Sequence, residues 1–341
     1  MKTIPSRVIA VLTLVAGLCG IVTASADERR VDRAWEAYVD RFITDEGRVI
    51  DTGNGNISHS EGQGWGMMLA QHYGDQQTFH KLWQWTRQQL GRQDVSLFSW
   101  RYDPSKTPPV RDNNNASDGD LFIAWALYLA AEQWDNRNYA NASSSIRRAI
   151  VDELVTDMAG YTVLLPGIEG FKHSDTADLN LSYWFVPAMQ DFAEMAPEEP
   201  WQALIDDGVS LLDETTFGRY RLPTDWVTLT ADGVVSPAEE WEPRFSFDAV
   251  RIPLYFAWGG RDEGASIGSI TAFWNDPAYQ PASAWINVTT DERAEYPISR
   301  GVRAINAFAN NQALPDPVPK EEDDYYSATL LLLTHMADDM R

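Results

Sequence analysis

Cysteine is almost absent from the chain. The single cysteine, Cys19, lies near the N-terminus. The segment around it has two positive charges, an apolar run of roughly a dozen residues and small residues ending at Ala26. Because that run is too short to span a bilayer, we expect residues 1–26 to be a cleaved signal peptide. A lipid anchor on Cys19 is the alternative, which Leu18 disfavours. Cleavage would exclude disulfides, thiolate catalysis and cysteine-bound metals from the mature protein.

Basic residues are scarce relative to acidic ones. Removing Lys2 and Arg7 with the N-terminal segment leaves 25 of the 27 basic residues against 50 acidic ones, a formal net charge of −25. Such a surface repels phosphate backbones and anionic lipid, so we expect no nucleic acid and no membrane as partner. Neutral and cationic substrates remain compatible with it.

Several other features are missing after residue 26. The sequence has no second long apolar run, no Gly/Ser linker and no low-complexity tract, so we expect residues 27–341 to form one large domain without membrane insertion. The five histidines show no HExxH spacing, and glycine-rich nucleotide loops and a GxSxG elbow are absent. We therefore expect no metal and no cofactor.

Helical periodicity dominates the remaining chain. Stretches of about 12 to 18 residues with apolar positions three and four apart alternate with loops rich in Gly, Pro, Asn and Asp. Strand signals are short, as in VTLT at 227–230 and YTVLL at 161–165. An all-α architecture of paired helices with small hairpins in the loops fits this pattern. The predicted helices are 31–43, 62–73, 76–90, 118–134, 138–158, 182–195, 198–213, 248–258, 263–275, 299–311 and 324–339.

Three acids stand at or near predicted helix starts: Glu61, Asp118 and Asp248. Each has an ordinary explanation. Asp118, with Ser117, is a plausible helix cap, and Glu61 is a first-turn acid stabilised by the helix dipole. Asp248 can form a surface ion pair with Arg251 three residues later. Together they favour a functional site, because the glycines and small residues beside them cost helix stability and leave room for a ligand.

Four stretches carry these residues: RVIDTGNGNISHSEGQGWGMMLA (48–70), NNASDGDLFIAWALYLAAEQW (114–134), LNLSYWFVPAM (179–189) and SFDAVRIPL (246–254). They resemble the successive signatures of glycoside hydrolase family 8, and more narrowly those of periplasmic endoglucanases that accompany bacterial cellulose synthases. They occur in the family's order and spacing and span most of the mature chain. The resemblance implies an (α/α)6 barrel, six helical hairpins in two concentric rings, with a substrate groove across one end.

The resemblance also implies roles for four residues. Glu61 matches the general acid and Asp248 the general base of an inverting glycosidase, whose carboxyl groups stand roughly 6.5–9.5 Å apart. Asp118 matches the aspartate that holds the central sugar in a distorted ring shape, and Tyr183 the tyrosine that orients the attacking water. A helix N-terminus alone would favour an ionised Glu61, so we expect an ionised Asp118 and desolvation to raise the pKa of Glu61.

Aromatic residues are abundant, with 14 Trp, 13 Tyr and 13 Phe, and they serve as core filler and as stacking platforms for sugars. Trp100 aligns with a family tryptophan that stacks on a sugar. Trp65 and Trp184 fit either the groove or the core. The other groove candidates implied by the resemblance or by loop position are Arg251, which pairs with the catalytic aspartates, Arg101 and Asn180 as hydrogen-bonding residues, and Trp226 and Trp241.

These observations predict an exported endo-β-1,4-glucanase that cuts cellulose or a soluble relative. Related family members act on chitosan, xylan or mixed-linkage glucan, which stay open as alternatives. An alternative from another class is a non-catalytic glycan-binding component of a polysaccharide export system, which the presence of all three acids disfavours. We expect a monomer in the periplasm or the medium, and the likeness to synthase-associated enzymes suggests a link to a cellulose synthase complex.

Overall fold

The structure is a computed structural model and describes residues 26–341. The predicted signal segment, with Cys19, therefore lies outside the described residues except for Ala26. Over residues 26–341, none of the helices combines the length and the apolar character that a membrane span requires.

All eleven predicted helices are present in the described part of the chain. Two short 3-10 helices, η1 (Leu181–Tyr183) and η2 (Ala249–Arg251), precede the sixth and eighth of them. The helices are α1 (Ala26–Phe42), α2 (Ser60–His72), α3 (Gln76–Gln89), α4 (Ser117–Trp134), α5 (Arg137–Leu154), α6 (Val186–Met195), α7 (Trp201–Glu214), α8 (Ile252–Trp258), α9 (Ala265–Trp274), α10 (Arg300–Ala309) and α11 (Tyr325–Asp339).

Two helices begin later than the sequence predicts, and each has a proline in its first turn. The segment predicted to be helical from 182 begins instead with η1, and α6 starts only at Val186, with Pro187 in its first turn. The segment predicted from 248 likewise divides into η2 and α8, with Pro253 in the first turn of α8. Proline has no N–H to donate, so it fits the first turn of a helix, where that donor would have no partner.

The helix predicted over 138–158 is four residues too long. Helix α5 ends at Leu154, and the chain continues as strand β3 (Val155–Met158), which pairs antiparallel with β4 (Tyr161–Leu164). Ala159 and Gly160 both have positive φ and form the turn between the strands. The remaining strands, β1 (Ser58–His59), β2 (Arg101–Tyr102), β5 (Thr176–Leu179), β6 (Val227–Thr230), β7 (Val235–Pro237), β8 (Arg244–Phe245) and β9 (Ile286–Asn287), form the pairs β1-β2 and β8-β9 and the sheet β5-β6-β7.

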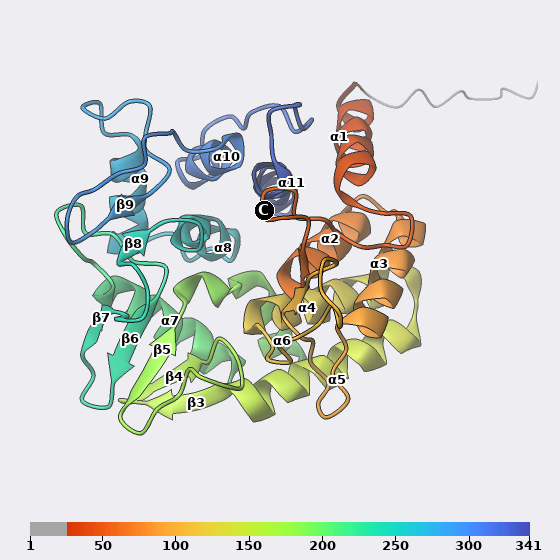
Figure 1. The fold of residues 1–341 in the computed structure, drawn as a ribbon, viewed down its shortest axis with the longest axis horizontal. Coiled ribbons are helices and arrows are strands. Elements are labelled where there is room, and N and C mark those ends of the chain that lie inside the picture. The colour runs from red at the N-terminus through yellow and green to blue at the C-terminus, as the bar shows by residue number, and fades with distance from the viewer. Residues whose placement is uncertain (1–25) are drawn as a thin grey trace, which may run out of the picture.

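Six helices form a closed inner ring. Each of α2, α4, α6, α8, α10 and α11 packs against the next, and α11 packs back against α2. Figure 1 shows these six around the centre of the view, with α1, α3, α5, α7 and α9 outside them. Within residues 26–341 the outer ring thus has five helices, because the loop 310–324 connects the inner helices α10 and α11 directly. The arrangement confirms the predicted (α/α)6 barrel.

The contact between α2 and α4 depends on a glycine. A Cβ on Gly64 of α2 would lie 2.6 Å from the Cβ of Phe122 and 3.2 Å from the backbone nitrogen of Ile123, both in α4. Distances this short leave no room for a methyl group unless the two helices separate. Because both helices are almost completely buried, a separation would also disturb the core around them.

We predict that Gly64→Ala destabilises the protein by about 1–3 kcal/mol, the usual cost of overpacking a core. The control is Gly268→Ala, at an exposed position in α9 where an added Cβ meets no atom within 4 Å. That change should leave stability unchanged or raise it by about 0.5–1 kcal/mol through better helix propensity. Urea unfolding curves measure both, and equal stability of the two variants would contradict the close approach of α2 and α4.

Candidate active site

One pocket of about 240 Å³ brings together all four predicted catalytic residues. Its walls come from the starts of several inner helices, so α2, α4, α8 and α11 point their N-termini at the same place. The positive ends of their dipoles therefore surround a site that contains several acids. The lining residues are Asp51, Asn54, Ile57, His59, Ser60, Glu61, Trp100, Ala116, Asp118, Tyr183, Asp248, Tyr325 and Tyr326.

Glu61 and Asp118 occupy the first turns of α2 and α4. The cap of α2 is His59, whose Nδ1 accepts the N–H of Gly62 at 3.0 Å. The cap predicted for α4 is wrong: Ala116 holds that position without a side-chain bond, and Asp118 accepts only the N–H of the next residue, Gly119, at 2.7 Å. The rest of the hydrogen-bonding capacity of Asp118 is directed into the site, where Glu61 is a partner.

Gly119 lets the two acids approach each other. A Cβ at this position would lie 2.6 Å from the backbone nitrogen of Glu61 and 2.3 Å from the hydroxyl oxygen of Ser60. A larger residue would have to push the starts of α2 and α4 apart. The glycine after Asp118 therefore serves the packing of α2 against α4, and the expectation that it leaves room for a ligand is wrong, because Ser60 and Glu61 fill the space beside it.

Arg251 is the shared partner of the three acids. Its Nη2 lies 3.1 Å from Glu61, 3.1 Å from Asp248 and 3.9 Å from Asp118. The same nitrogen donates to the hydroxyl of Ser182 at 3.0 Å. The guanidinium carbon stands 5.5 Å from the ring centroid of Trp65 and is buried, so its charge acts in a poorly solvated environment.

The three acids differ in access to water. The side chain of Asp118 is 3% exposed and that of Glu61 16%, whereas the side chain of Asp248 is 28% exposed. A general acid has to retain a proton and profits from burial, whereas a general base has to reach a water molecule. By exposure alone, Asp248 is the acid best placed to reach water, and Glu61 and Asp118 are better placed to keep a proton.

Burial raises the pKa of Glu61, and the Arg251 charge opposes that shift. Burial also raises the pKa of Asp118, to well above its ordinary value, and the charge of Glu61 adds to the effect. The two acids are hydrogen-bonded to each other, so the pair retains a proton. Since the guanidinium of Arg251 is nearer to Glu61, this proton is favoured on Asp118 in the absence of substrate.

This distribution corrects part of the sequence-based hypothesis. Desolvation does raise the pKa of Glu61, as expected, but Asp118 acts on it in the opposite direction, lowering that pKa through a hydrogen bond. The like charges that raise the pKa of Glu61 are those of Asp248 and Asp51. An ionised Asp118 therefore requires a change in the site, such as the arrival of a ligand.

Tyr183 lies in η1, just before α6, and lines the pocket beside the acids. Burial raises its pKa well above the ordinary value, and the neighbouring Asp118 and Asp248 raise it further. The phenol therefore keeps its proton over the working range of most enzymes and can act as a hydrogen-bond donor. Its ring meets the edge of Trp226 at a centroid distance of 6.1 Å.

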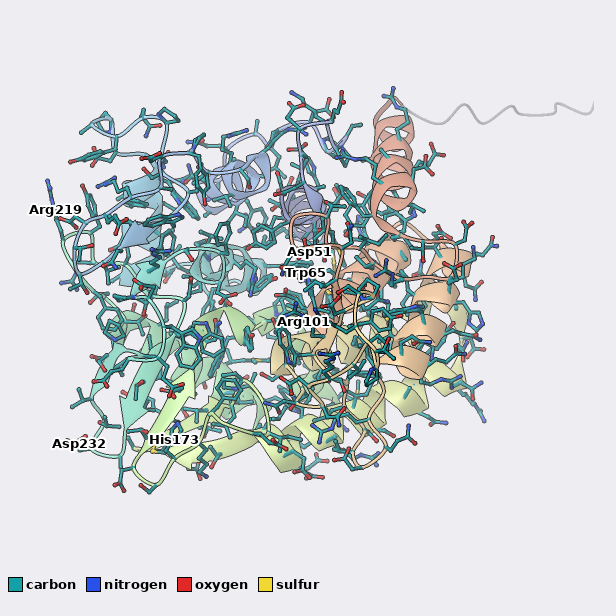
Figure 2. The ribbon with its side chains drawn as sticks, viewed as in Figure 1. Asp51, Trp65, Arg101, His173, Arg219 and Asp232 are labelled. Carbon is teal, nitrogen blue, oxygen red and sulfur yellow. The ribbon has the colours of Figure 1, made fainter. Side chains whose placement is uncertain are left out.

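Trp100 lines the pocket as predicted. Its Nε1 donates to Asp112 at 2.8 Å, which fixes the indole, and the guanidinium carbon of Arg101 lies 5.6 Å from its ring centroid. Arg101 lines a second pocket of about 310 Å³ that shares Trp100 with the first. Figure 2 labels Arg101 near Asp51 and Trp65 in the middle of the view. The two pockets meet at the indole, as an extended groove requires.

Besides Arg251, whose guanidinium contacts the acids, three predicted binding residues are buried and line neither pocket. Trp65 is completely buried in α2 and donates to the hydroxyl of Tyr255 at 3.1 Å. Trp184 is also completely buried and donates to the carbonyl of Leu204 at 2.9 Å. Both tryptophans fill the core, where their N–H groups find partners. Asn180 is buried too, and it caps η1 through its bonds to the backbone and hydroxyl of Ser182.

The loop tryptophans form a stack. The rings of Trp226 and Trp241 lie 4.5 Å apart and nearly parallel, and Phe171 stacks on Trp226 at 5.6 Å. Both tryptophans are partly exposed, unlike Trp184. The stack touches Tyr183 through Trp226, so it extends from the pocket along the sheet β5-β6-β7.

Among the lining residues that sequence reasoning missed, four have titratable side chains: Asp51, His59, Tyr325 and Tyr326. His59 lies between two acids, with Nε2 3.5 Å from Asp51 and Nδ1 3.6 Å from Glu61. The tyrosines begin α11, directly after its capping residue, Asp324. Like Glu61, the two tyrosines stand at a helix start. This position is the sequence signal that could have identified them as residues of the site.

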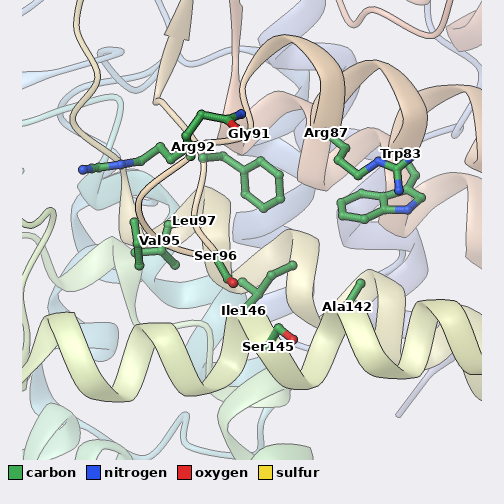
Figure 3. A pocket seen from close by; sticks show the side chains of 12 residues that line it. Trp83, Arg87, Gly91, Arg92, Val95, Ser96, Leu97, Ala142, Ser145 and Ile146 are labelled. Carbon is green, nitrogen blue, oxygen red and sulfur yellow. The ribbon is translucent and has the colours of Figure 1, made fainter.

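Another pocket lies on the flank of the barrel, between the end of α3, the loop 91–98 and α5. Its volume is about 310 Å³, and Figure 3 shows apolar side chains such as Val95, Leu97 and Ile146 along it. The twelve residues that line it include no carboxylate. It therefore lacks the groups for acid and base chemistry, and the pocket around Glu61 is the better candidate for an active site.

Comparison with known proteins agrees with this arrangement. The chain matches the family described as Glycosyl hydrolases family 8 over residues 4–340. It is 44% identical over 281 residues to an endoglucanase of Cellulomonas uda, covering 82% of this chain and 78% of the relative. It is 37% identical over 309 residues to a probable endoglucanase of Novacetimonas hansenii, covering 90% of each.

Solved structures give the same result. A family 8 endoglucanase from Klebsiella pneumoniae has a TM-score of 0.86 at 43% identity, over 90% of this chain and 99% of the other. The endo-β-1,4-glucanase CMCax from Acetobacter xylinum has a TM-score of 0.85 at 36% identity, over 92% of this chain and 98% of the other. Fold, acids and sequence agree, and the chain belongs to glycosyl hydrolases family 8.

Proposed function

We propose that this protein is an inverting endo-β-1,4-glucanase that hydrolyses cellulose or a soluble β-1,4-glucan. The observation that carries the proposal is the meeting of Glu61, Asp118 and Asp248 around Arg251 in one pocket. Relatives at 44% and 37% identity named endoglucanase or probable endoglucanase support the choice of substrate. Asp248, the most exposed of the three acids, accepts a proton from water, and Glu61 donates one to the leaving oxygen.

Substrate binding determines which of the two buried acids, Glu61 or Asp118, carries the shared proton. A sugar hydroxyl that donates to Asp118 stabilises the ionised form of that carboxyl. The proton shared by the pair then moves to Glu61, which faces the glycosidic oxygen. The same hydrogen bond holds the ring of the central sugar in its distorted shape. Tyr183, whose phenol stays protonated, orients the attacking water toward the anomeric carbon.

We also propose how the chain is organised, where it acts and what it does in the cell. Residues 27–341 act as one catalytic domain, without metal or cofactor, after export to the periplasm or the medium. Trp100 stacks on a sugar ring and Arg101 binds hydroxyls in the adjoining pocket. The likeness to synthase-associated endoglucanases supports a role beside a bacterial cellulose synthase, in which the enzyme would trim glucan chains.

Removing the acid should remove the activity. We predict that Glu61→Gln lowers reducing-sugar release from carboxymethylcellulose about 100- to 10,000-fold, the usual contribution of general acid catalysis. Asp191→Asn is the control, because Asp191 lies outside the pocket, where it accepts from Trp125. Equal and negligible release by the wild type and Glu61→Gln would instead favour a glycan-binding protein without catalysis.

The stereochemistry of the product tests the pair of carboxyl groups. An inverting enzyme that cleaves a β-1,4 bond releases a new reducing end in the α configuration, because water attacks from the face opposite the leaving group. Proton NMR of cellopentaose digests, recorded before mutarotation, should show the α-anomer first. An initial β-anomer would mean a covalent intermediate and would contradict the role of Asp248 as a base.

The pH dependence tests the role of Asp118. With substrate bound, an ionised Asp118 raises the pKa of Glu61, so the alkaline limb of the kcat profile reports loss of the proton from Glu61. Asp118→Asn removes that charge, and we predict that the alkaline limb moves to lower pH while kcat also falls. An alkaline limb at the wild-type position would refute the electrostatic role of Asp118.

A further inference from the structure

Asp225 lies just before β6 and has no part in the chemistry described above. Its carboxylate is directed at the segment that carries Asp248. Oδ1 accepts the N–H of Ser246 at 3.0 Å and the N–H of Ala249 at 2.8 Å, and the hydroxyl of Ser246 donates to Oδ2. A single side chain therefore fixes the backbone on both sides of the base.

These bonds replace the ones that Asp248 would normally make. Asp248 is the capping residue of η2, and an aspartate at such a position usually accepts a backbone N–H from the turn that follows. Here the N–H of Ala249 goes to Asp225, and the N–H of Val250 goes to the carbonyl of Ser246. The N–H of Arg251 goes to the carbonyl of Asp248, whose side chain makes no capping bond.

We propose that Asp225 is a positioning residue for the general base: it caps the turn in place of Asp248, so that the carboxylate of Asp248 stays free to face Arg251 and the attacking water. The proposal rests on the proposed function, in which Asp248 is the base. Asp225 itself touches neither substrate nor water in the reaction, and it acts only through the backbone of residues 246–249.

The surroundings of Asp225 support this role. Burial raises its pKa to about 7, and the charge of Asp248 adds to the shift. A half-buried carboxyl near a like charge is costly, and its three hydrogen bonds to the base segment offset part of that cost. A neutral residue would avoid the cost but would lose at least one of these acceptors.

Two substitutions separate the capping bonds from the charge. In Asp225→Asn the amide oxygen still accepts both N–H groups, so we expect kcat within about threefold of the wild type. In Asp225→Ala both bonds are lost, and kcat should fall about 10- to 100-fold, because small displacements of a catalytic group have effects of this size. The KM of both variants should stay within about twofold, because the binding residues are unchanged.

Asp178→Ala is the matched control. Asp178 is a buried acid in β5, the strand that pairs with β6, but it bonds to Thr228 and His173 rather than to the base segment. We expect its kcat to equal that of the wild type. Thermal melts of all variants test whether a loss of kcat follows a loss of folded protein.

A double-mutant cycle distinguishes positioning from a structural role. If Asp225 acts through the base, Asp225→Ala should lower kcat less than twofold once Asp248→Asn is present, because residues that act as a unit are not additive. A full, additive loss would overturn the proposal. Wild-type activity of Asp248→Asn alone would instead refute the proposed function, so the two failures are distinguishable.

If Asp225→Ala does not fold, Asp225→Glu provides a second test of the proposal. The longer side chain keeps the charge and the acceptors but shifts them by the length of one carbon–carbon bond. We expect kcat to fall at least tenfold with KM nearly unchanged. A wild-type kcat for this variant would overturn the proposal, because the position of the base segment would then not depend on the reach of Asp225.

Discussion

The buried guanidinium of Arg251 is the interaction on which the active site depends. Three carboxyl groups face one another in a pocket with little solvent, and without a cation their charges would repel. Arg251 lies on Trp65 and is held by Ser182, so its own position is fixed by the core and by η1. This nitrogen lies nearer to Glu61 than to Asp118, which favours the proton that the two acids share on Asp118.

The barrel supplies the second constraint. Inner helices that run in the same direction bring several N-termini to one end, and each contributes a residue at its first turn or just before it. The dipoles favour negative charge at this end, while burial favours neutral carboxyl groups. The balance differs among the acids: Asp248 is open to water, whereas Glu61 and Asp118 are covered and share a proton.

Tryptophans divide between core and groove by the secondary structure that carries them. Trp65 in α2 donates to Tyr255 of the inner helix α8, and Trp184 next to η1 donates to Leu204 of the outer helix α7, so both N–H groups are satisfied in the core. Trp100, Trp226 and Trp241 lie in loops or beside short strands and keep part of their surface exposed. Burial therefore separates a platform for sugars from core filler.

The sequence by itself determined the helices, because apolar spacing and flanking glycines act within a few residues, and it determined the acids, whose motifs are continuous in the chain. It erred where the signal was equally local but ambiguous, as at the end of α5 and at the cap of α4. Only the tertiary structure decided that Asp118 lowers the pKa of Glu61, and that Trp65 and Asn180 are buried. The tertiary structure alone also places Asp51, Tyr325 and Asp225 at or beside the site. Hydrogen bonds, charge interactions and desolvation depend on distances between segments that are far apart in the chain.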